Sequence, residues 1–268
     1  MVRILSFCVI LFANCFAISS LDLARNIVAN PSLDADLKLL FEGKNYTDHL
    51  GYPKWDTISS ILKTNSLVNF TLKSPTALNL SFSSQADSVL FIKILNDSLS
   101  EAGFVHFMPV KFTKNEALNI YTVRVESRYL LDPGLFSRIL SKNLVYIKNI
   151  KKIAYNSYEY ELDFSNAHFN PSILIPINSA KELRRPHRDY LISLQGATVI
   201  SIEANPSDNW FPKLLFLDGN LDLLESIKSP DKKNSLSRSI PSKAEYLIIG
   251  DNFNLDNIRR GLKIELRR

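Results

Sequence analysis

The amino-acid sequence predicts an α+β protein whose first part mixes helices with strands and whose last part is all β. Three observations support this. Apolar residues before Thr64 recur at spacings of three, four and seven, the spacing changes to two from Leu67, and helical periodicity disappears after Phe164. The chain has 268 residues, of which 46% are hydrophobic and 22% charged, so it can bury a sizeable core and is long enough for two domains.

Residues 1–19 are interpreted as a cleavable secretory signal peptide. Arg3 supplies a positive charge, Ile4 to Phe16 is almost wholly apolar, and Ala17 and Ser19 are small residues of the kind that a signal peptidase reads. We therefore expect cleavage near Ser19. The apolar run is shorter than the roughly 20 residues that span a bilayer, and no later segment is apolar enough, so no transmembrane span is expected after cleavage.

Both cysteines, Cys8 and Cys15, lie within this leader. The mature chain therefore offers no disulfide, thiolate ligand or cysteine nucleophile. Lipidation of Cys15 is an alternative, although Asn14 stands where a small residue is expected. An exported chain without cysteine is typical of a bacterial periplasm, and the chain as a whole resembles a bacterial periplasmic protein. Its formal charge of +5, reduced by one when Arg3 leaves, permits contact with an anionic surface.

The α+β domain is expected over residues 20–165, with short helices in 21–64 that pack on the rest of the domain. From residue 67 the alternation predicts a hairpin that turns at Lys73-Ser74-Pro75. Read from Thr76, the next elements are strand, helix, strand, strand, helix and strand, the βαββαβ order of a ferredoxin-like domain over 67–165. These segments, with one further strand at the end, are 78–82, 87–103, 104–112, 118–127, 132–140, 147–155 and 158–164.

Both helices of this domain have recognisable first residues. Asp87 or Ser84 is expected to cap the first helix, whose stop is Gly103. Asp132 is expected to cap the second, with Pro133 at the first helical position, where its missing N–H costs nothing.

Residues 166–172 are interpreted as a linker and residues 173–268 as a β-sandwich domain. Short apolar segments separated by Pro, Gly, Asn or Asp predict the strands 173–177, 189–195, 198–204, 214–217, 221–227, 236–240, 245–250 and 262–266. We expect Leu215, Leu217, Leu247 and Ile249 to point into the core between the sheets.

Three segments of the last domain carry a resemblance. They are Trp210-Phe211-Pro212, the LFLDG segment from Leu215 and the YLIIGD segment from Tyr246. Their spacing resembles the jelly-roll sandwiches appended to secreted bacterial proteins, including pre-peptidase C-terminal and carbohydrate-binding modules. The preceding α+β unit resembles small domains of secretion and pilus assembly proteins, an analogy of fold alone.

Motifs for catalysis, metal binding or cofactor binding are absent from the sequence. The four histidines include no pair at metal-ligand spacing, and there is no Gly-x-Ser-x-Gly nucleophile motif. The acidic pair Glu159 and Glu161 alternates along an expected strand, which a solvated face explains. No catalytic, metal-binding or cofactor-binding residue is therefore proposed.

The densest positive patch suggests a binding surface. Arg184, Arg185, His187 and Arg188 are the candidate partner-binding residues, because arginine forks bind carboxylate and phosphate well. The alternative is a solvated loop of the sandwich. Nucleic acid is not an expected partner, because aromatic stacking residues are not interleaved with the charges.

Trp210 is a candidate glycan contact, because carbohydrate modules present aromatic faces; its alternative is a plug in the sandwich core. Together these observations predict a non-catalytic periplasmic interaction or scaffold protein, an accessory of a secretion, pilus or flagellar apparatus. Its partner would be another envelope protein or an anionic polymer. The competing hypotheses are a glycan or cell-wall-polymer binding module and, third, an enzyme of unfamiliar type.

Overall fold

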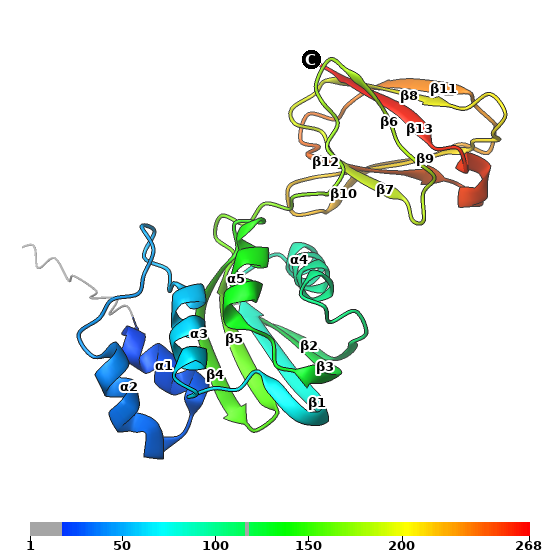
Figure 1. Ribbon diagram of the computed structural model, residues 1–268. Helices are drawn as coiled ribbons and strands as arrows, with labels where there is room; N and C mark the ends of the chain where they lie inside the picture. Colours follow the sequence, from blue (N-terminus) through cyan, green and yellow to red (C-terminus); the bar gives the residue numbers. More distant parts are fainter. Residues whose placement is uncertain (1–17, 116–117) are drawn as a thin grey trace, which may run out of the picture.

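The computed structural model describes residues 18–115 and 118–268, so almost all of the interpreted signal peptide lies outside the described residues. Figure 1 shows two lobes, and the mixture of helices, one mixed sheet and antiparallel sheets fits the predicted α+β class. The N-terminal lobe contains α1 (Ser20–Val28), η1 (Pro31–Leu33), α2 (Asp34–Phe41), α3 (Trp55–Thr64), β1 (Thr71–Ser84), α4 (Ser88–Glu101), β2 (Met108–Lys114), β3 (Asn119–Tyr129), α5 (Pro133–Ser141), β4 (Tyr146–Ala154) and β5 (Ser157–Asp163). The C-terminal lobe contains β6 (Ala180–Glu182), β7 (Tyr190–Ser193), β8 (Val199–Ala204), β9 (Pro212–Leu217), β10 (Leu223–Lys228), β11 (Ser235–Ser239), β12 (Tyr246–Asp251), η2 (Leu255–Ile258) and β13 (Leu262–Arg267).

Side-chain caps fix where the helices begin. Asp87, rather than Ser84, accepts a hydrogen bond from the Val89 N–H at 2.8 Å and caps α4. Asp132 accepts from the Gly134 N–H at 2.9 Å and caps α5, as predicted. The Ser19 hydroxyl accepts from the Asp22 N–H at 3.1 Å, so α1 begins directly after the expected cleavage position. None of the helices in 18–115 or 118–268 is long and apolar enough to cross a membrane.

The sheet of the N-terminal lobe has the strand order β2-β3-β1-β5-β4, with β1 and β5 parallel and the other pairs antiparallel. The predicted hairpin at Lys73-Ser74-Pro75 is wrong, because β1 continues through this segment as one strand. Its pairing with β3 is irregular between Thr71 and Thr76, and this irregularity accommodates Pro75, which has no N–H to donate. The strand β5 lies between β1 and β4, so the sheet has one strand more than a βαββαβ unit.

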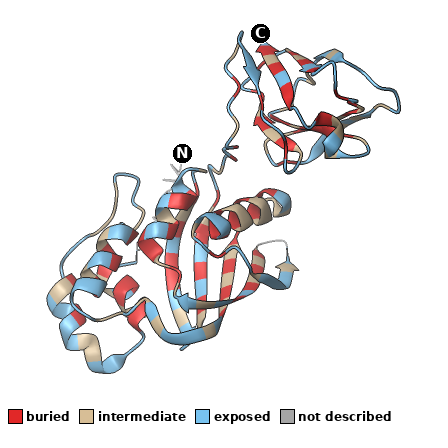
Figure 2. Ribbon diagram, turned by 45° about the vertical axis from the view of Figure 1, so that its right-hand side comes forward, coloured by how far each residue is buried: buried red, intermediate tan, exposed pale blue. Residues whose placement is uncertain are grey.

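The helices cover one face of this sheet, and the opposite face is polar. Leu78, Leu80 and Phe82 of β1 are fully buried and pair with buried residues of β3. On the other face Ser81 and Thr122 share a hydrogen bond of 2.8 Å. Figure 2 shows the resulting alternation of buried and exposed residues along the strands.

The C-terminal lobe consists of two antiparallel four-stranded sheets with the orders β10-β9-β12-β7 and β11-β8-β13-β6. Leu247 and Ile249 point into the core between them, as predicted. The same prediction for Leu215 and Leu217 is wrong. The inward residues of β9 are Leu214 and Phe216, and the outward pair packs against the core of the N-terminal lobe instead. Because both faces of β9 are apolar, alternation alone cannot assign its register.

Each lobe has one tryptophan at its centre. Trp55 is buried in the first core and donates its indole N–H to the Ile147 carbonyl at 2.7 Å. Trp210 is buried in the second and donates to the Gly250 carbonyl at 2.9 Å. Both indoles therefore satisfy their one polar group while filling a core.

Candidate functional site: a groove between the lobes

The two lobes meet at a groove of about 1030 Å³. It is bounded by the second half of α4, by the segment 169–174 and by the segment that leads into β7. A volume at the upper end of the range for ligand sites suits an extended segment of a macromolecule better than one small molecule.

The floor of the groove is apolar. Phe169 comes from the segment between the lobes, and Leu191 and Ile248 come from the outward face of the sheet β10-β9-β12-β7. Ile248 lies opposite Leu191 on one neighbouring strand and opposite Leu215 on the other, so an apolar row crosses three strands. Phe169 is buried, whereas Leu191 and Ile248 are half-buried, so these two leave apolar surface in the groove for a ligand to cover.

The wall formed by α4 has charges that are already paired. Lys93 contacts Asp97 at 2.6 Å and also lies 5.0 Å from the centre of the Phe169 ring. Lys142 forms an ion pair with Glu101. Because each cation has its own carboxylate, this wall is close to neutral.

The opposite wall is a basic loop, residues 184–189, which brings together three of the four predicted partner-binding residues. Arg185, His187 and Arg188 are exposed and line the groove. Arg185 contacts Asp256 at 2.8 Å. For His187 and Arg188, the described part of the chain provides no hydrogen-bond or ion-pair partner. Arg184 is exposed but does not line the groove.

The basic loop is held at its base. The Tyr190 hydroxyl donates to the Arg184 carbonyl at 2.5 Å and closes the loop, and the intervening Pro186 is buried. Burial raises the pKa of Tyr190 to about 12, so the phenol keeps the proton that it donates. Asp189 contacts Lys213 of β9 at 2.6 Å and fixes the loop's other end. Because both ends of the loop are held by these contacts, its exposed basic side chains project from a fixed backbone.

The segment between the lobes is also fixed, on both sides. The His168 N–H donates to the Asn143 carbonyl at 3.0 Å, and the Asn170 N–H donates to the Asn143 side chain at 2.9 Å. From the other lobe, the buried Tyr246 hydroxyl donates to the Phe169 carbonyl at 2.8 Å. The sequence suggested only a linker here, because a strand tyrosine and a polar Asn give no signal of such contacts.

The candidate glycan contact is wrong. Trp210 is 0% exposed and lies within the core of the C-terminal lobe, so no face of its ring is available to a sugar. The alternative interpretation, a core plug, fits its position. Aromatic character and a neighbouring proline are shared by both roles, so the sequence could not separate them.

The groove has charge and apolar surface but no assembled reactive group. Within the described residues, no three His, Cys, Asp or Glu side chains lie close enough together to hold a metal ion. Glu159 and Glu161 lie exposed on the uncovered face of the N-terminal sheet, where Glu161 contacts Lys148 at 3.1 Å. Comparison with protein-family models, curated proteins and solved structures finds no match to this chain.

Proposed function

We propose that this is an exported, non-catalytic interaction protein that binds an acidic, partly apolar segment of another envelope protein in the groove between its lobes. The observation that carries the proposal is the basic loop, whose His187 and Arg188 have no partner among the described residues and face a groove with an apolar floor. An arginine without a carboxylate, Arg188, beside an apolar row suits a segment that alternates acidic and apolar side chains.

The proposed compartment is the bacterial periplasm, reached by cleavage of the leader. The leader's charge and apolar run support export, and the absence of cysteine after Cys15 fits that compartment. Mass spectrometry of the mature chain should find an N-terminus near Ser20 or Leu21. Recovery of an intact Met1 from a soluble cytoplasmic fraction would contradict export.

The finer fold assignments support an accessory role in a secretion, pilus or flagellar assembly. For the N-terminal lobe we propose a ferredoxin-like unit with β5 inserted beside β1, which the order β2-β3-β1-β5-β4 supports. For the C-terminal lobe we propose a jelly roll. Its eight strands divide between two sheets in the alternating order that a double Greek key produces.

The rival function is binding of an anionic cell-wall polymer. Such a polymer would meet the same arginines but would leave the apolar row at Ile248 uncovered. A protein segment uses both features, and we therefore favour it.

The test is chemical cross-linking and recovery of partners from cell envelopes. The double substitution Arg185→Ser with Arg188→Ser should leave the melting temperature nearly unchanged, because exposed charges contribute little to stability, while partner recovery falls several-fold and becomes less sensitive to salt. Arg184→Ser is the matched control, since Arg184 is exposed on the same loop but outside the groove.

A third variant separates the two kinds of partner. Ile248→Thr keeps the branched shape but reduces the apolar floor, so it should weaken retention of a protein segment and leave retention on an anionic polymer column unchanged. Unchanged stability together with unchanged partner recovery in the Arg185 and Arg188 variant would refute the proposal.

A further inference from the structure

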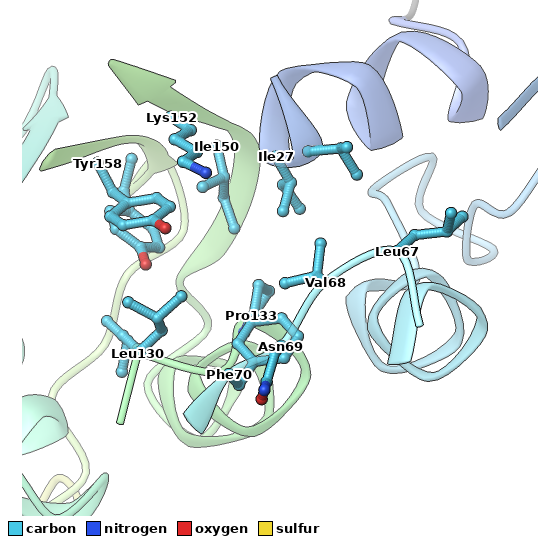
Figure 3. Close-up of a pocket in the computed structure, with 13 residues that line it drawn as sticks. Ile27, Leu67, Val68, Asn69, Phe70, Leu130, Pro133, Ile150, Lys152 and Tyr158 are labelled. Atoms are coloured by element: carbon cyan, nitrogen blue, oxygen red, sulfur yellow. The ribbon is translucent and has the colours of Figure 1, made fainter. Parts of the chain in front are cut away.

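The N-terminal lobe contains a second, separate cavity of about 130 Å³. Four parts of the chain enclose it: the end of α1, the segment 67–70 before β1, the segment 130–133 that leads into α5, and the second half of β4 with the first half of β5. Figure 3 shows Lys152 and Tyr158 on one side of this cavity and Ile27 and Val68 on the other. It shares no residue with the groove.

Two tyrosine hydroxyls line the cavity without a partner. Tyr160 is 2% exposed, and in residues 18–115 and 118–268 nothing accepts or donates a hydrogen bond at its hydroxyl. The same holds for the hydroxyl of Tyr158, which is 8% exposed. Burial raises the pKa of both phenols, so both remain protonated donors at neutral pH. Neither hydroxyl is among the described side-chain atoms that are both inaccessible and without a partner, so both oxygens open into the space of the cavity. There they are free to donate hydrogen bonds to a bound acceptor.

The charge around the cavity is positive on balance. Lys152 lines it and makes no ion pair with a described residue, and the lining includes no Asp or Glu. Outside the lining, the negative charge of Asp132 contributes to the raised pKa of Tyr160. Its carboxylate is already bound by Lys63 and by the Gly134 N–H, so it does not occupy the cavity's donors.

The remaining surface and the volume define the rest of the ligand. Ile27, Val68, Leu130 and Ile150 are aliphatic. An apolar protein cavity of about 150 Å³ is known to hold a benzene ring, so this one admits a ring or a branched chain of similar size.

We propose that this cavity binds a small carboxylic acid with an aromatic or branched apolar body. The carboxylate accepts hydrogen bonds from the Tyr158 and Tyr160 hydroxyls and faces the Lys152 ammonium, and the apolar body packs toward Ile27 and Val68. Both donors come from β5 and the ammonium comes from the adjacent β4, where Lys152 lies opposite Tyr158 in the register. The site is therefore built into the sheet itself.

The experiment is calorimetric titration of the mature chain with two carboxylates, benzoate and 4-methylpentanoate, and with benzamide as the uncharged match of benzoate. Benzoate or 4-methylpentanoate should bind and raise the melting temperature, and benzamide should bind at least about 10-fold more weakly than benzoate. No heat from either carboxylate at roughly 10 mM would overturn the proposal.

Substitutions then assign the recognition to the named groups. Tyr160→Phe removes only an unpartnered hydroxyl, so the fold should be kept, and carboxylate affinity should fall about 10-fold. Lys152→Met removes the ammonium, so the difference in affinity between benzoate and benzamide should become smaller than in the unsubstituted chain. Tyr155→Phe is the matched control, because Tyr155 is 75% exposed and outside the cavity. If both the Tyr160 and Lys152 variants bind the carboxylates with wild-type affinity, the proposed binding site is wrong. These titrations do not test the proposal for the groove between the lobes, because the two sites share no residue.

Discussion

The two lobes differ in how completely their buried polar side chains are hydrogen-bonded. Among the described residues, the buried side-chain atoms without a partner all lie in the N-terminal lobe: the hydroxyls of Ser59, Ser84, Ser88 and Ser98 and the carbonyl oxygen of Asn119. In the C-terminal lobe, both oxygens of each buried carboxylate, Asp208 and Asp251, accept hydrogen bonds. Asp251 alone accepts from the N–H groups of Phe211, Phe253 and Asn254 and from the Asn257 amide.

This difference follows from how each core is covered. Helices laid on one sheet face leave gaps at their ends, and the cavity at Tyr160 is such a gap. Two facing sheets enclose their core between them. The loops that connect the strands are held by buried acceptors such as Asp208, which accepts a hydrogen bond from the Arg260 N–H at 3.0 Å. We infer that the C-terminal lobe supplies a stiff frame and the N-terminal lobe the more adaptable partner.

The largest expected effect tests the stiffness of the C-terminal lobe. Gly261 has φ +87°, and an added Cβ would lie 1.8 Å from the Leu183 carbonyl oxygen, so Gly261→Ala should destabilise this lobe by roughly 3–5 kcal/mol. Gly196→Ala is the control. Its φ is +71° but nothing lies within 4 Å, so only the backbone cost of about 1–2 kcal/mol is expected. Urea unfolding measures the loss of stability in each variant. Equal losses would show that the backbone around Gly261 relaxes to accept the added Cβ, and that the C-terminal lobe is not stiff there.

The next effect sharpens the assignment of the faces of β9. Leu214→Ala removes a fully buried side chain from the sandwich core and should cost on the order of 2–5 kcal/mol. Leu215→Ala removes a half-buried side chain from the outward face, so a loss of roughly 1–2 kcal/mol is expected. Thermal unfolding measures both. A reversed order would mean that the strand presents its other face to the core.

An effect confined to the N-terminal lobe is expected in acid. Burial acts to raise the pKa of Asp132, but the hydrogen bond and charge of Lys63 and the N–H groups of Gly134 and Leu135 outweigh it and hold the pKa below its ordinary 3.8. A depressed pKa adds stability that is complete above the unfolded value and is lost as pH falls through the folded value. Stability should therefore drop below about pH 4.

Asp132→Asn isolates this contribution. The variant should be less stable at neutral pH, because it loses the ion pair with Lys63, and its stability should fall less between neutral pH and acid. Far-ultraviolet circular dichroism across the pH range measures both. A wild-type acid profile in the variant would assign the drop to other carboxylates.

The smallest effect concerns the junction of the lobes. Limited proteolysis should cut between Asn166 and Pro176 and leave two resistant fragments, as the predicted domain division at residues 166–172 requires. Cleavage should be slow, because Phe169 is buried and held by Tyr246. Tyr246→Phe removes that hydrogen bond, worth about 1 kcal/mol, and should raise the cleavage rate about five-fold. One resistant core spanning the junction would contradict the division.

Local signals in the sequence predicted local structure well. Asp87 and Asp132 cap the helices for which they were proposed, and the alternation at Leu78, Leu80 and Phe82 marks the buried face of β1. These features depend on a few neighbouring residues, and their physical cause lies within the segment itself.

What escaped prediction depends on contacts between distant segments. The pairing of Thr71 with Tyr129 carries β1 past Pro75, where turn chemistry alone suggested a hairpin. For the candidate sites, the sequence identified the basic loop by its charge density but gave no sign of the groove opposite it. The unpartnered Tyr160 hydroxyl gave no signal either, since a strand tyrosine looks the same whether or not its hydroxyl is satisfied.

The two tryptophans make intrinsic fluorescence a probe of the unfolding of each lobe. The sequence has two, and Trp55 and Trp210 lie in separate cores, each sealed from water. A chain with only Trp55 would fluoresce from the N-terminal lobe, and a chain with only Trp210 from the C-terminal lobe. Exposure to water shifts indole emission to longer wavelengths, so the two single-tryptophan chains would record the melting of each lobe separately, without an attached dye.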